Sequence, residues 1–246
     1  MKLVGDEFKE VLSEKSKSND SKLILALDVP KNIEDEKLEQ KCLEILEKAS
    51  NSIAAVKIGY PLVLKTGLEI IAEASETSNV PIIADFKIAD IPHISKEIAR
   101  YAYESGAEAV IAHGFTGRDS LEAINEISKK MGNKGVIVVS NMSHPGGEKF
   151  IRPVSDEILN LAKKVGATGI IGPATRPEDV SKLRSKAGNE ILILTPGIGA
   201  QGAKAGDAIK SGADYEIVGR AIYNSESPEE SAERIRKEIN QNISEG

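Results

Sequence analysis

The 246-residue sequence has no tryptophan, and aromatic residues make up only 4% of it. Proteins that bind single-stranded nucleic acid stack the bases on aromatic side chains, so this composition argues against such a surface. Acidic residues outnumber basic ones, 38 to 32, which gives a net charge of −6 at pH 7. That balance argues against broad binding to nucleic acid or to anionic membranes, although a local pocket can still be positive.

Cysteine and long apolar runs are scarce as well. Cys42 is the only cysteine, which excludes an internal disulfide and suits a reducing cytoplasm. No stretch approaches the roughly 18 apolar residues of a membrane-spanning helix. Residues 1–20 carry acidic side chains throughout and lack the apolar run of a secretory signal. We therefore expect a cytoplasmic protein that binds neither nucleic acid nor membrane.

What the sequence does contain is a regular alternation of short apolar runs with longer segments in which apolar residues recur at helical spacing. The short runs are rich in Val, Ile and Leu and nearly continuous, as expected of strands buried on both faces. The candidate strands are 22–29, 53–59, 81–87, 107–114, 135–141, 167–172, 191–197 and 214–219. The helical segments are 34–49, 95–104, 118–131, 153–165, 176–187, 202–211 and 227–243.

Eight strand-helix units in about 220 residues match the size of an α/β TIM (β/α)8 barrel. A doubly wound sheet also alternates, but eight evenly spaced units favour closure. No second domain is indicated. We expect residues 1–21 to form an N-terminal extension with a helix and a polar linker, and residues 22–246 to form the catalytic barrel.

Polar and charged residues gather where the candidate strands end. In TIM barrels the active site lies at the C-terminal ends of the strands, so this placement predicts a functional site there. The residues at or just past a strand end are Asp28, Lys57, Asp85, Lys87, His113, Ser143, Thr195 and Arg220.

The densest group is in "ADFKIADIP", residues 84–92. Asp85 and Lys87 are two residues apart on a strand, so they point to the same face. Lys57 occupies the matching place on the preceding strand, and Asp90 follows in the loop. Because buried charges persist only when paired, the four predict a row of alternating charge. Such a row is either a structural salt-bridge network or a catalytic site, and its position at the barrel's C-terminal face favours catalysis.

A second group follows the last two strands. "LTPGIGAQGAKAGD" (194–207) and "IVGRAIY" (217–223) occupy the places where TIM barrels commonly build a phosphate site from backbone N–H groups. Glycines there let the backbone approach an anion closely, and Arg220 can make a bidentate phosphate contact. The alternative is that these are turn glycines and a surface arginine.

The remaining candidates are less specific. Ser143, in "SNMSHPGGEKF" (140–150), offers a hydroxyl that could read a polar ring edge, or it is an ordinary turn former. His93, His113 and His144 show no metal-ligand spacing, and the sequence has neither a P-loop nor a dinucleotide fingerprint. These residues therefore give no sign of a metal site or of a dinucleotide site.

Taken together, these motifs resemble the orotidine 5′-phosphate decarboxylase family, particularly its archaeal form. The resemblance runs from about residue 22 to 223 and is carried most specifically by the D-x-K-x-x-D-I-P element. The matching segments are "LALDV", "VKIGYPLVL", "ADFKIADIP", "MSHPG", "GPATRPE", "TPGIGAQG" and "IVGRAIY".

This resemblance implies loss of CO₂ from C6 of orotidine 5′-monophosphate to give UMP, the last step of de novo pyrimidine synthesis, without metal or cofactor. It implies a homodimer in which Asp90 reaches the neighbour's site, and a 197–207 loop that closes as a lid. It assigns the chemistry to Lys57, Asp85, Lys87 and Asp90. It assigns ribose contacts to Asp28 and Lys57, the pyrimidine to Ser143, and phosphate to Gln201 and Arg220, with further ligand contacts at Ile91, Pro196, Gly197 and Gly219.

One position departs from the family pattern, which continues D-I-P-x-T. The threonine reaches across the dimer in the family, but here the position holds Ile94, with Ser95 next. Either Ser95 substitutes or the contact is lost.

Two rival functions stay open: a Mg²⁺-dependent 3-keto-gulonate-phosphate decarboxylase, which typically has an acidic residue at the place of Lys57, and a catalytically silent barrel that binds a nucleotide or a protein.

Overall fold

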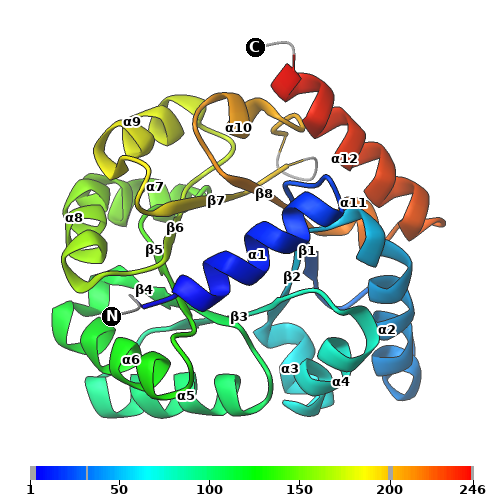
Figure 1. The fold of residues 1–246 in the computed structure, drawn as a ribbon, viewed down its shortest axis with the longest axis horizontal. Helices are drawn as coiled ribbons and strands as arrows, with labels where there is room; N and C mark the ends of the chain where they lie inside the picture. Colours follow the sequence, from blue (N-terminus) through cyan, green and yellow to red (C-terminus); the bar gives the residue numbers. More distant parts are fainter. Residues whose placement is uncertain (1–3, 32, 199–201, 245–246) are drawn as a thin grey trace.

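The computed structural model is a closed barrel of eight parallel strands, so the predicted (β/α)8 fold is confirmed (Figure 1). The structure describes residues 4–31, 33–198 and 202–244. Each strand pairs with the next in the chain, and β8 closes the barrel against β1. The strands are β1 (Leu23–Leu27), β2 (Ala55–Gly59), β3 (Ile82–Ile88), β4 (Ala109–His113), β5 (Gly135–Val139), β6 (Gly169–Ile171), β7 (Leu192–Pro196) and β8 (Tyr215–Val218).

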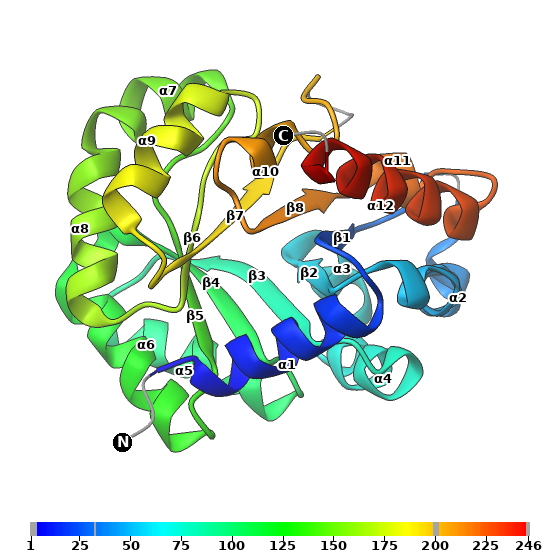
Figure 2. The same ribbon diagram turned by 45° about the horizontal axis from the view of Figure 1, so that its top comes forward.

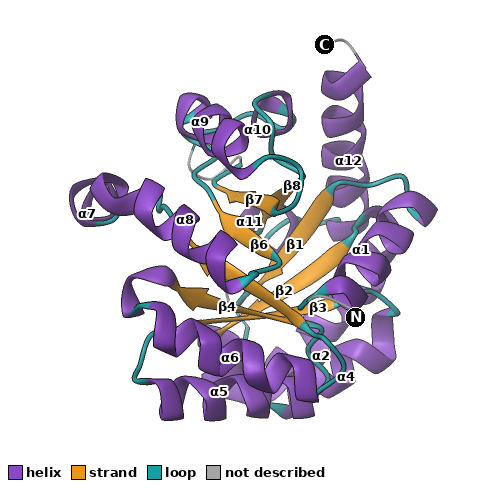
Figure 3. Cartoon of the chain, turned by 60° about the vertical axis from the view of Figure 1, so that its left-hand side comes forward, coloured by secondary structure: helices purple, strands orange, loops and turns teal. Residues whose placement is uncertain are grey.

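Helices surround the barrel on its outside (Figures 1 and 3). The long ones are α1 (Asp6–Ser18), α2 (Leu38–Ala49), α4 (Glu69–Ser78), α5 (Pro92–Glu104), α6 (Arg118–Lys130), α8 (Ser155–Val165), α9 (Pro177–Ala187) and α12 (Pro228–Ser244). The shorter ones are α3 (Tyr60–Thr66), α7 (Pro145–Phe150), α10 (Asp207–Lys210) and α11 (Arg220–Tyr223), with 3-10 turns at Asp35–Lys37, Ser50–Ser52, Gly114–Thr116 and Arg152–Val154.

The strands are apolar on both faces because each face meets a different part of the core. On β1, Leu23 and Leu25 point outward and pack with the surrounding helices, whereas Ile24 and Ala26 point into the barrel. The same alternation on β3 puts Ile83 inside the barrel. Continuing the period of two along β3 therefore carries Asp85 to the inner mouth of the barrel.

Helix α1 lies across one end of the barrel (Figures 1 and 2). Phe8 and Leu12 are fully buried and belong to the same apolar cluster as the inward residues of the strands. Gly135, at the start of β5, leaves room for the Phe8 ring: an added Cβ would lie 2.7 Å from Phe8. The helix thus closes the N-terminal end of the barrel, opposite the strand ends where the charged residues gather.

Most predicted helices are present, with shifted ends, and some were missed. The segment predicted at 202–211 contains a helix only at Asp207–Lys210. Helices α3 and α4, between β2 and β3, were not among the predicted segments. Within the described residues, no helix is both long and apolar enough to cross a membrane.

Candidate active site

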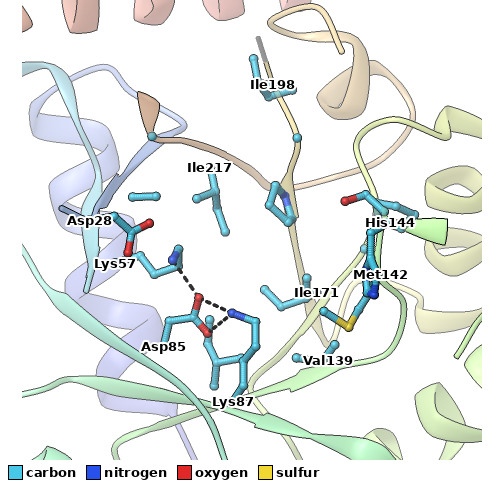
Figure 4. A pocket seen from close by; sticks show the side chains of 18 of the residues that line it. Asp28, Lys57, Asp85, Lys87, Val139, Met142, His144, Ile171, Ile198 and Ile217 are labelled. Carbon is cyan, nitrogen blue, oxygen red and sulfur yellow. Dashed lines mark hydrogen bonds and ion pairs between the residues drawn. The ribbon is translucent and has the colours of Figure 1, made fainter. Parts of the chain in front are cut away.

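A cavity of about 350 Å³ opens at the C-terminal ends of the strands (Figure 4). This volume lies at the small end of the range for ligand pockets. Most of the residues predicted from the sequence to form the site line it together: Asp28, Lys57, Asp85, Lys87, Ser143, Pro196, Gly197, Gly219 and Arg220.

One part of the cavity wall is a carboxylate held between two ammonium groups (Figure 4). Lys57 Nζ donates to Asp85 Oδ2 at 2.7 Å, and Lys87 Nζ donates to Oδ1 at 2.9 Å and to Oδ2 at 2.8 Å. Lys57 reaches Asp85 from the neighbouring strand, where Gly59 is the register partner of Asp85. The structure thus joins three members of the charged row that the sequence suggested.

All three charged side chains lie at the boundary between core and cavity, but they differ in how much of their surface is exposed. Asp85 and Lys57 are buried, with 6% and 8% of their surface exposed, whereas the Lys87 side chain is 43% exposed. Lys87 is therefore the cation of the group that is most open to the cavity. A ligand in the cavity can reach its ammonium group without displacing Asp85.

The electrostatics keep Asp85 and Lys57 ionised. Burial disfavours the anion of Asp85, but Lys57 and Lys87 outweigh it and lower its pKa below the usual range. Burial likewise disfavours the cation of Lys57, but Asp85 and then Asp28 raise its pKa above the usual range. Opposite charges in contact stabilise each other's charged forms, so these two groups form an ionised pair across the physiological range.

Strand β3 is irregular where it carries these residues. Its pairing with β4 shifts between Ala84 and Ile88, so a bulge contains Asp85 and Lys87. Lys87 has φ 42°, a left-handed conformation that side chains other than glycine rarely adopt. Bulges commonly lie beside active sites and redirect side chains, and such strain persists where surrounding contacts impose it. Here the contact with Asp85 holds the lysine in place.

Asp90 does not join the other three charges within this chain. It is exposed, it is not part of the cavity lining, and its carboxylate accepts a hydrogen bond from the Ile91 N–H at 2.7 Å. Its carbonyl accepts hydrogen bonds from the hydroxyls of Ser95, at 2.8 Å, and Ser120. The predicted row therefore has three members in one chain, because Asp90 lies beyond the end of β3, where strand alternation no longer applies.

The structure also shows the surroundings of Ile94 and Ser95, which follow the D-I-P element where the family pattern has a threonine. Ser95 is buried, and its hydroxyl is committed to Asp90 inside the same chain. Ile94 is 38% exposed and Ile91 is 65% exposed, and neither lines the cavity. Ile91 thus lies away from the ligand cavity of its own chain.

Apolar side chains form much of the remaining cavity surface, and we did not predict them from the sequence. Ile111, Val139, Ile171 and Ile217 are the inward residues near the ends of four strands, and Met142 and His144 add to the wall. The signal was present, because the period of two that places Asp85 inward also selects these positions. They make the cavity weakly polarisable, and charges inside it interact more strongly than in water.

The far end of the cavity is built from the loops after β7 and β8. Pro196 and Gly197 line it from one loop, and Gly219 and Arg220 from the other. Gly197 has φ 124°, which strongly favours glycine. Gln201, predicted from the family resemblance, lies outside the described residues.

Ser143 lines the cavity from the loop after β5, and a network unrecognised in the sequence supports that loop. Arg176 donates to the carbonyl of Met142 at 2.9 Å and to Asn141 Oδ1 at 3.1 Å. Asp179 accepts from Arg176 at 2.7 Å and from Asn141 at 3.3 Å. The segment before Ser143 is thereby tied to the start of α9.

Two other residues at strand ends have different surroundings. Thr195 is fully buried, and its hydroxyl donates to the Tyr215 carbonyl at 3.2 Å. His113 does not line the cavity; its ring lies 4.7 Å from that of Phe115, and burial, then Lys87, lowers its pKa. Among the described residues, no group of three or more His, Cys, Asp or Glu side chains could hold a metal ion.

The fold and the cavity define a class: a (β/α)8 barrel with a charged, ligand-sized site at the C-terminal face, the arrangement of barrel enzymes. The model of the Orotidine 5′-phosphate decarboxylase / HUMPS family matches residues 21–235. The chain belongs to this family.

Curated relatives support this assignment over nearly the whole chain. It is 51% identical to "Orotidine 5′-phosphate decarboxylase" of Methanosarcina barkeri, over 88% of this chain and 94% of the relative. It is 49% identical to the protein of the same name from Thermococcus kodakarensis, over 89% and 97%. The chain is accordingly an enzyme of the carboxy-lyase class.

Solved structures support the same family assignment. Orotidine 5′-monophosphate decarboxylase from Methanocaldococcus jannaschii, complexed with the inhibitor BMP, superposes with a TM-score of 0.82 at 42% identity, covering 89% of this chain and 99% of that one. The Pyrococcus horikoshii OT3 enzyme gives 0.79 at 43% identity, covering 89% and 99%.

Proposed function

We propose that this chain decarboxylates orotidine 5′-monophosphate at C6, giving UMP and CO₂, without a metal, as the last step of de novo UMP synthesis. The observation that carries the proposal is the Asp85 carboxylate held between Lys57 and Lys87 at one end of an apolar cavity. The names of the relatives, and the inhibitor in one structural neighbour, support the same substrate.

In this proposal the ligand spans the cavity. The phosphate binds Arg220 and the backbone around Pro196, Gly197 and Gly219, with Gln201 as a further ligand. Asp28 and Lys57 hold the ribose hydroxyls, and Ser143 reads the polar edge of the pyrimidine. The remaining apolar wall accommodates the flat faces of the ring, and C6 is presented to Lys87.

The reaction then breaks one bond and forms one. The bond from C6 to the carboxylate breaks, CO₂ departs, and the electron pair stays on C6 in the plane of the ring. The ammonium of Lys87 stabilises this charge and then transfers a proton from Nζ to C6. The neutral amine regains a proton from water after product leaves.

One lysine cannot supply the whole rate enhancement. A unit charge at about 4 Å contributes roughly 4 kcal/mol at an effective dielectric near 20, whereas enzymes typically lower barriers by about 8–23 kcal/mol. The rest comes from a preorganised site and from the binding energy of the remote phosphate. In this proposal Arg220 therefore contributes to the rate enhancement as well as to substrate binding.

Asp85 has two roles in this account. Its ionised carboxylate orients both ammonium groups through the hydrogen bonds at 2.7–2.9 Å. It also faces the substrate carboxylate, and the repulsion between them is relieved as CO₂ leaves. Both roles require a negative charge at this position, which the lowered pKa of Asp85 provides.

We further propose a cytoplasmic homodimer in which Asp90 completes the partner's site. Exposed apolar side chains gather near the ends of β2 and β3: Tyr60 at 38%, Leu64 at 80%, Ile91 at 65% and Ile94 at 38%. Pairing would cover this surface. Since the Ser95 hydroxyl is committed within the chain, we infer that Ile94 replaces a polar cross-dimer contact with an apolar one.

The Mg²⁺-dependent sugar-phosphate decarboxylase is the rival within the same superfamily. The presence of Lys57 argues against it, because an acidic residue typically stands there in those enzymes. Here the Lys57 ammonium is already committed to Asp85 and would repel a divalent cation. The two functions differ in metal dependence and in substrate, so one assay separates them.

Replacing Arg220 with alanine is expected to weaken handling of phosphorylated substrate selectively. Hydrogen bonds to charged groups contribute about 1.5–3 kcal/mol, so kcat/KM for orotidine 5′-monophosphate should fall by roughly 10- to 150-fold. Turnover of the nucleoside orotidine should change little. Steady-state kinetics with both substrates measures the difference.

Arg118→Ala, which removes an exposed arginine of α6 paired with Glu122, is the matched control and should behave like the wild type. An equal loss on nucleotide and nucleoside in Arg220→Ala would show that Arg220 does not bind the phosphate.

A further inference from the structure

Glu216 is a buried acidic residue that the proposed chemistry does not use. It lies on β8 and is fully buried, while its neighbours Tyr215 and Ile217 point into the barrel. By alternation, Glu216 points outward, between the sheet and the helices that cover it. A buried carboxylate is costly unless other groups compensate it, so its partners indicate what it does.

Those partners are backbone N–H groups of one short segment. Glu216 Oε2 accepts from Gly206 at 2.8 Å, and Oε1 accepts from Ala208 at 3.0 Å and Ile209 at 3.4 Å. Among the described residues no cation pairs with it. The carboxylate thus holds the segment that leaves the loop after β7 and starts α10.

The position of Glu216 connects the two halves of the proposed phosphate site. The segment it holds ends the loop that begins at Pro196 and Gly197. Gly219 and Arg220 follow Glu216 by three and four residues, directly after β8. Glu216 is also the register partner of Thr195 on β7. One side chain therefore ties the far end of the first loop to the strand that presents Arg220.

We propose that Glu216 is a positioning residue for phosphate binding, which holds residues 206–209, at the end of the connection after β7, against the strand that precedes Arg220. It touches neither the cavity nor any reacting atom, and it acts through the backbone of Gly206 to Ile209. This inference rests on the proposed function for the identity of the phosphate ester.

The clamp depends on ionisation. The pKa of Glu216 is raised to about 7. Burial is the main cause, and the negative charge of Asp207 on α10 adds to it. The three N–H donors favour the anion and partly offset this rise. Its register neighbours on β7 and β1, Thr195 and Leu23, do not titrate. Protonation removes an acceptor site and sets an O–H against N–H donors, so the clamp weakens as pH falls below 7.

The test is ligand binding by Glu216→Gln, measured by titration calorimetry with UMP and with uridine. The amide is nearly the same size but has one acceptor oxygen and presents an NH₂ to a backbone donor. We expect UMP affinity to fall by about tenfold, as for a lost charge-assisted hydrogen bond, with uridine affinity unchanged. In kinetics, KM for the nucleotide should rise more than kcat falls.

The pH profile gives a second readout. From pH 8 to 6 the wild-type preference for UMP over uridine should decline more than that of Glu216→Gln, because only the wild type has a Glu216 carboxylate that takes up a proton in this range. The second ionisation of phosphate, near pH 6, affects both proteins alike. If Glu216→Gln fails to fold, Asp207→Asn replaces it: removing that anion should shift the decline to lower pH. An unshifted profile would contradict the proposal.

Phe8→Leu is the control for destabilisation, since Phe8 is buried at the opposite end of the barrel. If Glu216→Gln lowers the Tm but leaves the UMP-to-uridine preference as in Phe8→Leu, Glu216 is merely structural and the proposal is wrong. If the wild-type protein prefers UMP but does not decarboxylate orotidine 5′-monophosphate, the proposed function is wrong. The role of Glu216 in phosphate binding is then still decided by comparing UMP and uridine affinities in Glu216→Gln and Phe8→Leu.

Discussion

Replacing Lys87 with alanine should lower turnover of orotidine 5′-monophosphate by about 10⁵-fold or more. The substitution removes two contributions. The ammonium stabilises the charge on C6 by roughly 4 kcal/mol, or about 10³-fold, and proton donation typically contributes a further 10²- to 10⁴-fold, roughly. Among the described residues that line the cavity, the other lysine, Lys57, is no equivalent, since it is buried and bonded to Asp85.

Binding of UMP should survive the same substitution. Lys87 lines the cavity from β3, whereas Arg220 follows β8. The Lys87 side chain is 43% exposed, so its removal opens space without disturbing the core. Single-turnover kinetics and calorimetry with UMP measure the two effects separately. Lys96→Ala, which removes a lysine of α5 paired with Glu126, is the control.

Substantial remaining turnover in Lys87→Ala would contradict the assignment of Lys87 as proton donor. Loss of UMP binding together with turnover would instead indicate that the lysine maintains the shape of the site. Only a selective loss of turnover fits the account.

Asp85→Asn should reduce both stability and turnover. The substitution leaves the buried ammonium of Lys57 without its ionised partner, and breaking a buried ion pair on one side costs about 3 kcal/mol. It also removes the anion that orients Lys87 and opposes the substrate carboxylate. Loss of such a preorganised group lowers turnover by about 10²-fold or more.

The stability that Asp85 and Lys57 contribute to the wild type should be lost only at pH values far from neutrality. Because the pKa of Asp85 is lowered on folding, its contribution is full above its unfolded pKa near 3.9 and is lost as pH falls through the folded value. The pKa of Lys57 is raised, so its contribution is full below about 10.4 and is lost as pH rises through the folded value.

Urea unfolding of wild type and Asp85→Asn between about pH 5 and 7 should therefore give a nearly constant difference in the free energy of unfolding. Glu216 titrates within this window in both proteins, so its effect cancels. Asp156→Asn, at a half-buried surface carboxylate paired with Lys182 and Lys186, should cost much less. A wild-type advantage that disappears as pH falls from about 7 to 5 would show that Asp85 is protonated in the folded protein, and would contradict the ionised pair.

The barrel and the centre of the site could be predicted because both follow from local periodicity. Eight apolar runs alternating with helical segments specify the fold class. The period of two along β3 places Asp85 and Lys87 on one face, and adjacent strands bring Lys57 beside them. Periodicity does not predict the backbone conformation of this strand. The bulge and the left-handed conformation of Lys87 depend on pairing with β4.

Other features depend on contacts that periodicity does not contain. The direction of Asp90 is set by a loop and by the hydroxyls of Ser95 and Ser120. The position of α1 across the barrel depends on packing of Phe8 against Gly135, more than 120 residues away in the sequence. Glu216 interrupts an apolar strand, and its partners are backbone groups, which no side-chain pattern reveals.

The most direct test of the account is to mix the purified protein with orotidine 5′-monophosphate in EDTA and follow the orotate ultraviolet band. We predict rapid loss of the band with stoichiometric formation of UMP, because Lys87 and Asp85 act without a divalent cation. An intact band in EDTA, and again in Mg²⁺, would contradict the proposed function. Activity on the nucleotide that requires Mg²⁺ would contradict the metal-free mechanism.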